Sequence, residues 1–190
     1  MKSLCSKFTL VTSRPGLFLD RDGVLIEDKG YVNSKKDTSF IASSFEAISL
    51  ARASGFLIFV ITNQAGIAKG YYTEEECLEF NKWLMEEFAS KNASIDELVY
   101  CPSHPDFGDR ISCNCRKPGT GMLESLANKW NIDLTNSLLL GDKDSDVLAG
   151  HNFRISSELI SPSSDLVEIV KNHILFAKET SKVRKVSAIG

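Results

Sequence analysis

Short apolar runs recur along the chain, and stretches with the spacing of an amphipathic helix separate them. The runs cover residues 17–19, 56–61, 95–100 and 137–140, and a weaker one covers residues 155–160. They are too short for helices, and the runs at 17–19 and 56–61 are apolar at every position instead of alternating with polar residues. This pattern predicts strands that are covered on both faces, as in a parallel sheet.

The intervening segments predict helices. Helical spacing covers residues 45–53, where Gly55 follows as the expected cap, and returns in 122–130, 144–149 and 164–177. Thr73 and Glu76 form a capping box ahead of another helix, in which Cys77, Phe80, Leu84 and Phe88 share one stripe. Strands that alternate with helices predict an α/β fold, a doubly wound, mostly parallel sheet with helices on both faces, Rossmann-like and without a large cap domain.

The length of 190 residues favours one domain. We expect an N-terminal arm over 1–15, the α/β domain over 16–177 with an irregular loop at 101–117, and a C-terminal tail over 178–190. The alternating apolar residues near the start leave open whether the arm is loose or adds an edge strand.

The composition limits the kinds of molecule that the protein is expected to bind. The formal net charge is −3, and no basic stripe is present, which argues against a nucleic-acid surface and favours a small anionic metabolite. No apolar run is long enough for a signal peptide or a membrane span, and five cysteines, an odd number, fit a reducing compartment better than a disulfide framework. We therefore expect a cytoplasmic protein, monomeric and without a membrane partner.

Two aspartates, Asp20 and Asp22, end the first apolar run, and Gly23 follows them. Side chains two residues apart in an extended segment point to the same side, so both carboxylates converge while Arg21 turns away. Two close carboxylates need a cation between them, or a proton on one of them. A solvated acidic turn after a strand is the alternative for this motif alone.

Further polar clusters end later apolar runs or follow the irregular loop. They are Thr62-Asn63-Gln64, Arg116-Lys117-Pro118 and Gly141-Asp142-Lys143. Each alone is compatible with a turn or a solvated surface. Ligands of doubly wound sheets bind at the carboxyl ends of the strands, and all of these clusters fall there, which predicts a single site.

With these motifs in order, the sequence resembles the haloacid dehalogenase superfamily of phosphohydrolases. The resemblance is carried by FLDRDGVL, by GYV at residues 30–32, and by TNQAGIAKGYY, CNCRKP and GDKDSD, and it spans residues 16–150. It is similar above all to the branch of the D-glycero-D-manno-heptose-1,7-bisphosphate 7-phosphatases and the histidinol-phosphate phosphatases. The resemblance implies a Mg²⁺-dependent phosphatase that acts on a small phosphorylated sugar through an aspartyl phosphate.

The resemblance also implies roles for individual residues. Asp20 is the expected nucleophile, Asp22 the general acid and base, and Thr62 and Lys117 the donors to the transferred phosphoryl group. Mg²⁺ would bind Asp20, the backbone carbonyl of Asp22, and Asp142, with Asp146 in support. The remaining substrate contacts are expected from Asp28, Lys29, Gly30, Tyr31, Asn63, Gln64, Ala65, Arg116 and Lys143.

Four residues of the irregular loop have the chemistry of a tetrahedral zinc site: Cys101, His104, Cys113 and Cys115. A structural zinc would clip this loop, which has little core of its own. The related phosphatases use Cys-x-His, whereas this chain has Ser103 at the position of that histidine and His104 one residue later. Either the loop shifts so that His104 binds the metal, or the cysteines are reduced thiols without one.

The expected function is removal of the 7-phosphate of a heptose bisphosphate in the synthesis of nucleotide-activated heptose. Histidinol phosphate or another small sugar phosphate is the alternative substrate. A signalling receiver also gathers carboxylates, a threonine and a lysine, but its phosphorylated aspartate follows the third strand, where this chain has cysteines. A catalytically silent, zinc-clipped binding module is a further alternative, although it would not need both Asp20 and Asp22.

Overall fold

The computed structural model describes residues 13–107 and 113–187, the last seven of them by their backbone alone. In this part of the chain, five strands form one parallel sheet in the order β3-β2-β1-β4-β5. The strands are β1 (Gly16–Leu19), β2 (Leu57–Asn63), β3 (Glu97–Cys101), β4 (Leu138–Gly141) and β5 (Ser156–Leu159). The parallel sheet is confirmed, whereas most of the predicted N-terminal arm lies outside the described residues.

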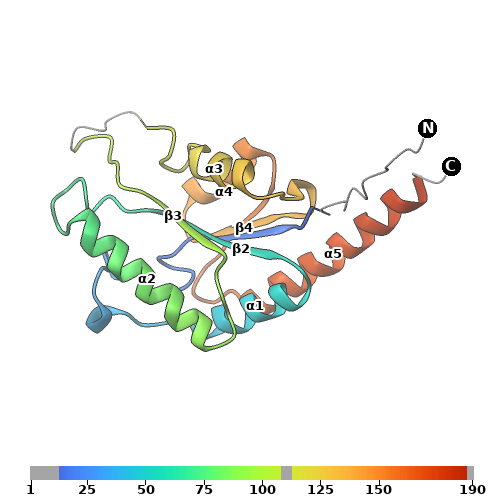
Figure 1. The fold of residues 1–190 in the computed structure, drawn as a ribbon, viewed down its shortest axis with the longest axis horizontal. Helices are drawn as coiled ribbons and strands as arrows, with labels where there is room; N and C mark the ends of the chain where they lie inside the picture. Colours follow the sequence, from blue (N-terminus) through green and yellow to red (C-terminus); the bar gives the residue numbers. More distant parts are fainter. Residues whose placement is uncertain (1–12, 108–112, 188–190) are drawn as a thin grey trace, which may run out of the picture.

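Helices cover both faces of the sheet (Figure 1). The helices α1 (Ala42–Ala53), α2 (Glu74–Ser90) and α5 (Leu166–Ser187) lie on one face, and α3 (Gly121–Lys129) and α4 (Asp144–Phe153) lie on the other. Two short 3₁₀ turns, η1 (Lys35–Asp37) and η2 (Leu134–Asn136), complete the elements. This is the doubly wound arrangement that the alternation of strands and helices predicted.

Two hydrophobic clusters, one on each face, explain why the inner strands β2, β1 and β4 are apolar along most of their length, whereas the edge strands β3 and β5 carry polar residues such as Glu97 and Glu158. Leu17 and Leu19 belong to the cluster under α1, α2 and α5, whereas Phe18 between them belongs to the cluster under α3 and α4. Ile58 and Phe59 divide between the faces in the same way. Because successive side chains of a strand point to opposite faces, an inner strand that is covered on both faces needs apolar residues at successive positions.

The predicted helix ends are present. Thr73 accepts a hydrogen bond from the backbone of Glu76, whose side chain accepts one from the backbone of Thr73, and this closes the capping box of α2. Gly55 follows the end of α1 with φ of +92°, a conformation that favours glycine.

Several element boundaries differ from the prediction, and α4 continues to Phe153 instead of ending at residue 149. The first helix begins at Ala42 and not at residue 45, and α5 continues to Ser187, so the segment predicted as a tail begins as part of this helix. Its apolar positions before residue 178, which include Val170 and Ile174, pack in the core, and helical structure then continues without a break.

The strand order places the topological switch point between β1 and β4. The chain builds β2 and β3 on one side of β1, then crosses to build β4 and β5 on the other. The residues that follow β1, β2 and β4 therefore meet at one edge of the sheet, where doubly wound folds bind their ligands. Among the helices described, none combines the length and the apolar character needed to cross a membrane.

Candidate active site

Asp20 lies directly after β1 and is 5% exposed. Its Oδ1 atom accepts hydrogen bonds from the backbone N–H of Arg21 at 2.8 Å, and it lies 3.0 Å from Nζ of Lys117. Oδ2 receives no hydrogen bond from the described part of the chain. The carboxylate is thus fixed by one oxygen, and the other is available for chemistry.

Lys117 is buried and bridges two carboxylates. Its Nζ lies 3.0 Å from Asp20 and 2.7 Å from Asp146, and it donates to the carbonyl of Ile61 at 2.7 Å. Burial alone would lower the pKa of Lys117, but the two carboxylates outweigh it and raise this pKa. Asn63 holds the lysine in place, because its amide pairs with both the N–H and the carbonyl of the Lys117 backbone.

Asp142 joins this group, which we call the acidic cluster: Asp20, Lys117, Asp142 and Asp146. One carboxylate oxygen of each aspartate lies within 4.8 Å of the others. Burial, followed by the nearby carboxylates, raises the pKa of Asp142 to about 6, although Lys143 opposes the shift. Burial likewise raises the pKa of Asp146 against the opposing effect of Lys117.

The acidic cluster fits a hard divalent cation such as Mg²⁺, which prefers carboxylate oxygens. Oδ1 of Asp142 is buried and has no hydrogen-bond partner among the described residues, as expected for an atom that binds a cation. Gly23 makes the close approach possible: a Cβ atom at this position would come within 2.2 Å of the Asp142 carboxylate, and φ of Gly23 is +86°.

Asp22 is held by its neighbour Arg21. The guanidinium donates from Nε to Oδ2 and from Nη2 to Oδ1, both at 3.1 Å. Burial raises the pKa of Asp22, although Arg21 opposes the shift. Arg21 is predicted to turn away while Asp20 and Asp22 converge, but its guanidinium lies against Asp22 and is completely buried.

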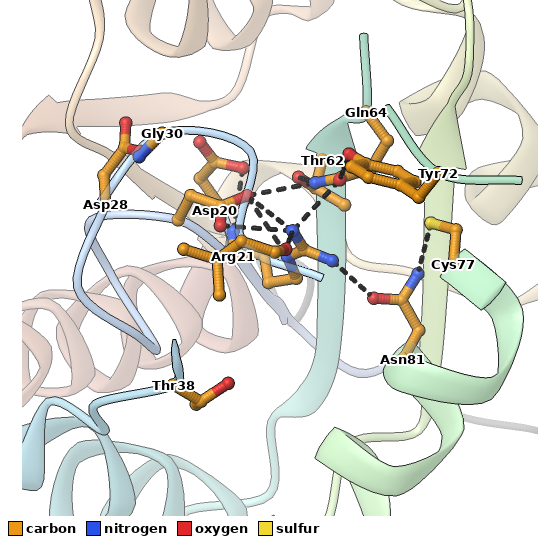
Figure 2. Close-up of polar contacts among 12 residues, drawn as sticks. Asp20, Arg21, Asp28, Gly30, Thr38, Thr62, Gln64, Tyr72, Cys77 and Asn81 are labelled. Atoms are coloured by element: carbon orange, nitrogen blue, oxygen red, sulfur yellow. Dashed lines mark hydrogen bonds and ion pairs between the residues drawn. The ribbon is translucent and has the colours of Figure 1, made fainter. Parts of the chain in front are cut away.

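Sequence reasoning missed this role of Arg21. Its guanidinium also donates to Asn81 at 2.9 Å, to the carbonyl of Val32 at 2.7 Å and to Gln64 at 3.0 Å (Figure 2). It lies over the ring of Phe80, 5.0 Å from the centroid. The sequence does contain a signal for this role, because Arg21 closely follows an apolar, buried strand. A charge at such a position must find hydrogen-bond or ion-pair partners in the interior.

A cleft of about 400 Å³ opens at this edge of the sheet. Asp20, Asp22, Lys117 and Asp146 line it, together with Asp28, Gly30, Tyr31, Asn63, Gln64, Ala65, Tyr72, His104, Arg116, Lys143 and Ser145. The cleft thus gathers most of the predicted substrate residues. Lys29 is not among them, because its Nζ binds Ser39 and the carbonyl of Asp37 on its own loop. Thr62 lies behind the lining, 1% exposed.

Asp28 and Lys143, which both line the cleft, form an ion pair, with Nζ 2.8 Å from Oδ2. Burial alone would raise the pKa of Asp28, but the hydrogen bonds from Lys143 and the Gly30 backbone lower it. Burial alone would lower the pKa of Lys143, but the carboxylates of Asp28 and Asp142 raise it. Two charged loops that are distant in sequence are therefore joined at this side of the cleft.

Three of the four predicted zinc ligands come together. Cys101, Cys113 and Cys115 form what we call the cysteine cluster, with all three sulfur atoms within 4.8 Å of one another. Cys101 Sγ lies 3.7 Å from Cys113 Sγ, and Cys113 and Cys115 are joined as a disulfide. Soft sulfur ligands at this spacing fit zinc once the thiols are reduced.

His104 is not part of the cysteine cluster. Its Nδ1 accepts a hydrogen bond from the backbone of Asp106 at 3.1 Å, and its ring packs against Phe107. His104 lines the cleft instead. The expectation that the loop shifts to let His104 bind the metal is therefore not met in this structure.

Comparison with known proteins identifies the family of the chain. The HAD-hydrolase-like family model matches residues 114–162. The chain is 37% identical over 151 residues to the D-glycero-beta-D-manno-heptose-1,7-bisphosphate 7-phosphatase of Vibrio cholerae, an alignment that covers 78% of this chain and 81% of the relative. It is 40% identical over 147 residues to the D-glycero-alpha-D-manno-heptose-1,7-bisphosphate 7-phosphatase of Burkholderia mallei, an alignment that covers 76% of this chain and 78% of that relative.

A solved structure has the same fold. The D,D-heptose 1,7-bisphosphate phosphatase from B. bronchiseptica, complexed with magnesium and phosphate, superposes with a TM-score of 0.71 at 24% identity, over 83% of this chain and 97% of that chain.

Fold and site together define a phosphatase, a phosphoric monoester hydrolase of the haloacid dehalogenase-like class. Within that class, the chain belongs to the family of the D-glycero-D-manno-heptose-1,7-bisphosphate 7-phosphatases.

Proposed function

We propose that this phosphatase removes the 7-phosphate of D-glycero-D-manno-heptose 1,7-bisphosphate, with Mg²⁺ and through an aspartyl phosphate on Asp20. Relatives that carry this name for the beta and for the alpha anomer are of similar identity, so the proposal covers both anomers. We also propose that the protein acts as a monomer.

One observation supports the choice of a bisphosphate as substrate: the Arg116 guanidinium lies at the cleft without an ion-pair partner among the described residues. This guanidinium lines the cleft beside the acidic cluster, donates to the carbonyl of Ser103 at 3.1 Å, and has no ion-pair partner among the described residues. A guanidinium at a cleft wall without a carboxylate partner suits bidentate contact with an anion of the substrate. Lys117 already serves the transferred phosphoryl group, so Arg116 is available for the second phosphate.

In the first step, Oδ2 of Asp20 attacks phosphorus, and the bond from phosphorus to the sugar oxygen breaks. Asp22 gives its proton to that oxygen as the sugar leaves, and the raised pKa of this carboxyl favours the protonated form that the step requires. Lys117 stabilises the charge that spreads over the phosphoryl oxygens.

In the second step, water attacks the aspartyl phosphate, and Asp22 takes the proton of the water. The bond between phosphorus and Asp20 breaks, which regenerates the carboxylate and releases inorganic phosphate. Mg²⁺, held by Asp20, the backbone carbonyl of Asp22 and Asp142, with Asp146 in support, would offset the repulsion between the nucleophile and the phosphate. A structural zinc on the cysteine cluster would fix the loop that carries Arg116 and Lys117.

The test is phosphate release from both anomers of the heptose bisphosphate, heptose 7-phosphate and histidinol phosphate, with and without Mg²⁺. We expect the highest kcat/KM for the bisphosphate, and none of these activities after chelation of Mg²⁺. Arg116→Ala should lower kcat/KM far more for the bisphosphate than for the monophosphate. Equal losses on both would reject the role of Arg116, and a preference for histidinol phosphate would reject the heptose substrate.

A further inference from the structure

Gln64 lies just after β2 and is 2% exposed, although it contributes to the cleft. Its amide is surrounded by polar groups of the protein (Figure 2). Nε2 donates to Oδ2 of Asp22 at 3.0 Å and to Oγ1 of Thr62 at 2.8 Å. Oε1 accepts from Nη2 of Arg21 at 3.0 Å and from the hydroxyl of Tyr72 at 2.7 Å.

These four bonds use the whole capacity of the side chain. A glutamine amide has two N–H donors and one oxygen with two lone pairs, and each of them has a partner here. The backbone N–H is also used, because it donates to the carbonyl of Cys101 at 2.8 Å. The expectation that the Gln64 side chain binds substrate therefore conflicts with its bonding, since a substrate contact would first require one of these bonds to break.

The orientation of the amide is determined by the two donors that face its oxygen. A guanidinium has donors only, so an amide turned by 180° would place its NH₂ group against the N–H groups of Arg21. Tyr72 adds the second donor, and Gly66 makes room for it: a Cβ atom at Gly66 would lie 2.3 Å from the tyrosine ring. The motif Gln64-Ala-Gly66 and Tyr72 thus belong to one arrangement.

The fixed amide also orients the two groups that it contacts. Thr62 accepts the N–H of Gln64, so the hydroxyl hydrogen of Thr62 points away from that amide. Asp22 receives the other N–H, in addition to the guanidinium of Arg21, and its carboxylate is held from two sides. Thr62 is the expected hydrogen-bond donor to the phosphoryl group, and Asp22 is the acid of the proposed reaction.

We propose that Gln64 is a positioning residue, which orients the Thr62 hydroxyl and the Asp22 carboxylate for phosphoryl transfer, and that Arg21 and Tyr72 fix its amide for this task. This inference rests on the proposed function and deepens it. It assigns the Gln64 side chain to the internal frame of the site and not to the sugar.

The test is Gln64→Met, which keeps the length of the side chain and removes all four bonds. The variant is assayed with the heptose bisphosphate and with p-nitrophenyl phosphate, which has no sugar. A misplaced catalytic group slows every substrate, so we expect kcat to fall about 10²-fold on both, with KM within about twofold of the wild-type value. A loss limited to the bisphosphate, or seen mainly in KM, would show that Gln64 binds the sugar, and an unchanged kcat would also overturn the proposal.

Tyr72→Phe tests the chain of contacts, because it removes one bond to Gln64 and keeps the ring. We expect kcat to fall about tenfold in the wild-type background and no further in the Gln64→Met background, since Tyr72 acts through Gln64. Additive losses would overturn this part of the proposal.

A matched control is Asn136→Ala, which removes another buried amide just before β4, at the opposite end of the strands. It should lower Tm and leave kcat unchanged. An equal fall of kcat in this control would mean that a loosened fold explains the loss in Gln64→Met, and would overturn the proposal.

Failure of the proposed function is visible separately, as a wild-type protein that releases phosphate from neither ester. The contacts are then tested by thermal unfolding of the single and double variants. If Gln64→Met and Tyr72→Phe together lower Tm no more than Gln64→Met alone, the two side chains act as one unit. Additive shifts of Tm would contradict it.

Discussion

The acidic cluster and the cysteine cluster lie at the same edge of the sheet but are held in different ways. Asp20 and Asp142 follow neighbouring strands, Asp146 lies in the first turn of α4, and the buried Lys117 joins Asp20 to Asp146. In the cysteine cluster only Cys101 belongs to a strand, while Cys113 and Cys115 belong to the irregular loop.

The difference shows which interactions hold the side chains of each cluster in position. Paired charges and strand ends organise the acidic cluster before any ligand binds, whereas the position of two of the three sulfurs depends on a loop with few hydrophobic residues. A bound metal would therefore refine the first cluster and would organise much of the second. The predictions below test this contrast.

The largest expected effect follows from Asp20→Asn. The amide has nearly the shape of the carboxylate but cannot form an acyl phosphate, so phosphate release should fall by at least about 10⁴-fold. Tm should stay close to that of the wild type, since Lys117 keeps its contact with Asp146. Near-normal phosphate release by this variant would remove Asp20 from the role of nucleophile.

Lys117→Met should destabilise the fold as well as the reaction. It leaves Asp20 and Asp146 buried without their cation, which typically costs about 3–5 kcal/mol of unfolding free energy, and it removes a donor worth about 10²–10³ in kcat. Urea unfolding with and without Mg²⁺ measures the first effect, and Mg²⁺ should restore part of the stability. The comparison variant is Lys143→Met, whose exposed ion pair with Asp28 should cost no more than about 1 kcal/mol.

Mg²⁺ binding should weaken as the pH falls below about 6. The pKa of Asp142 is raised to about 6 by burial, so this carboxylate holds a proton at pH values where an ordinary aspartate has lost it. The cation must displace that proton, and its affinity should fall by up to tenfold per pH unit below pH 6. Calorimetric titrations between pH 5 and 8 measure this dependence.

The exposed Asp144 provides the control for the titration. Asp144→Asn removes a charge from the first turn of α4 without changing a residue of the acidic cluster. It should leave the pH dependence of Mg²⁺ binding unchanged. An affinity for Mg²⁺ that is constant from pH 5 to 8 would contradict the assignment of Asp142.

The smallest effects concern the cysteine loop. Protein purified under reducing conditions should contain about one zinc per chain, and Cys101→Ser should lose it. Because His104 contacts Asp106 and Phe107 instead of the sulfurs, His104→Ala should leave the zinc content unchanged. Metal analysis by mass spectrometry, with thiol titration as a check on the oxidation state, measures both. Reduced protein without zinc would mean that the cysteines are simple thiols.

Sequence reasoning placed the acidic cluster because strand ends are predictable. An apolar run defines a buried strand, a parallel sheet brings the carboxyl ends of its strands to one edge, and Asp20 and Asp142 then have to meet there. The capping box at Thr73 and the glycine at residue 55 are local signals, and they were correct for the same reason: their partners lie a few residues away.

Contacts that depend on distant or irregular segments were not predictable. The alternation of side chains shows that Arg21 leaves the face of Asp20, but it does not show that Asn81 of α2 and Gln64 after β2 would receive its guanidinium. The direction of the His104 side chain was not predictable for a related reason. His104 belongs to an irregular loop, where side chains do not alternate with a fixed period as they do in a strand or a helix. The length of α5 was missed because its later residues lack an apolar stripe.

The central position of β1 has a consequence for how the chain acquires its fold during synthesis. The ribosome makes β1 first among the described strands, and β2 follows to cover one of its edges. The other edge pairs with β4, and the backbone of Gly16 bonds to Ser137, 121 residues later in the chain. Until then an apolar strand edge stays open, which is the kind of surface that recruits chaperones or aggregates. The nascent protein should thus depend most on protection while residues 64–137 are being added.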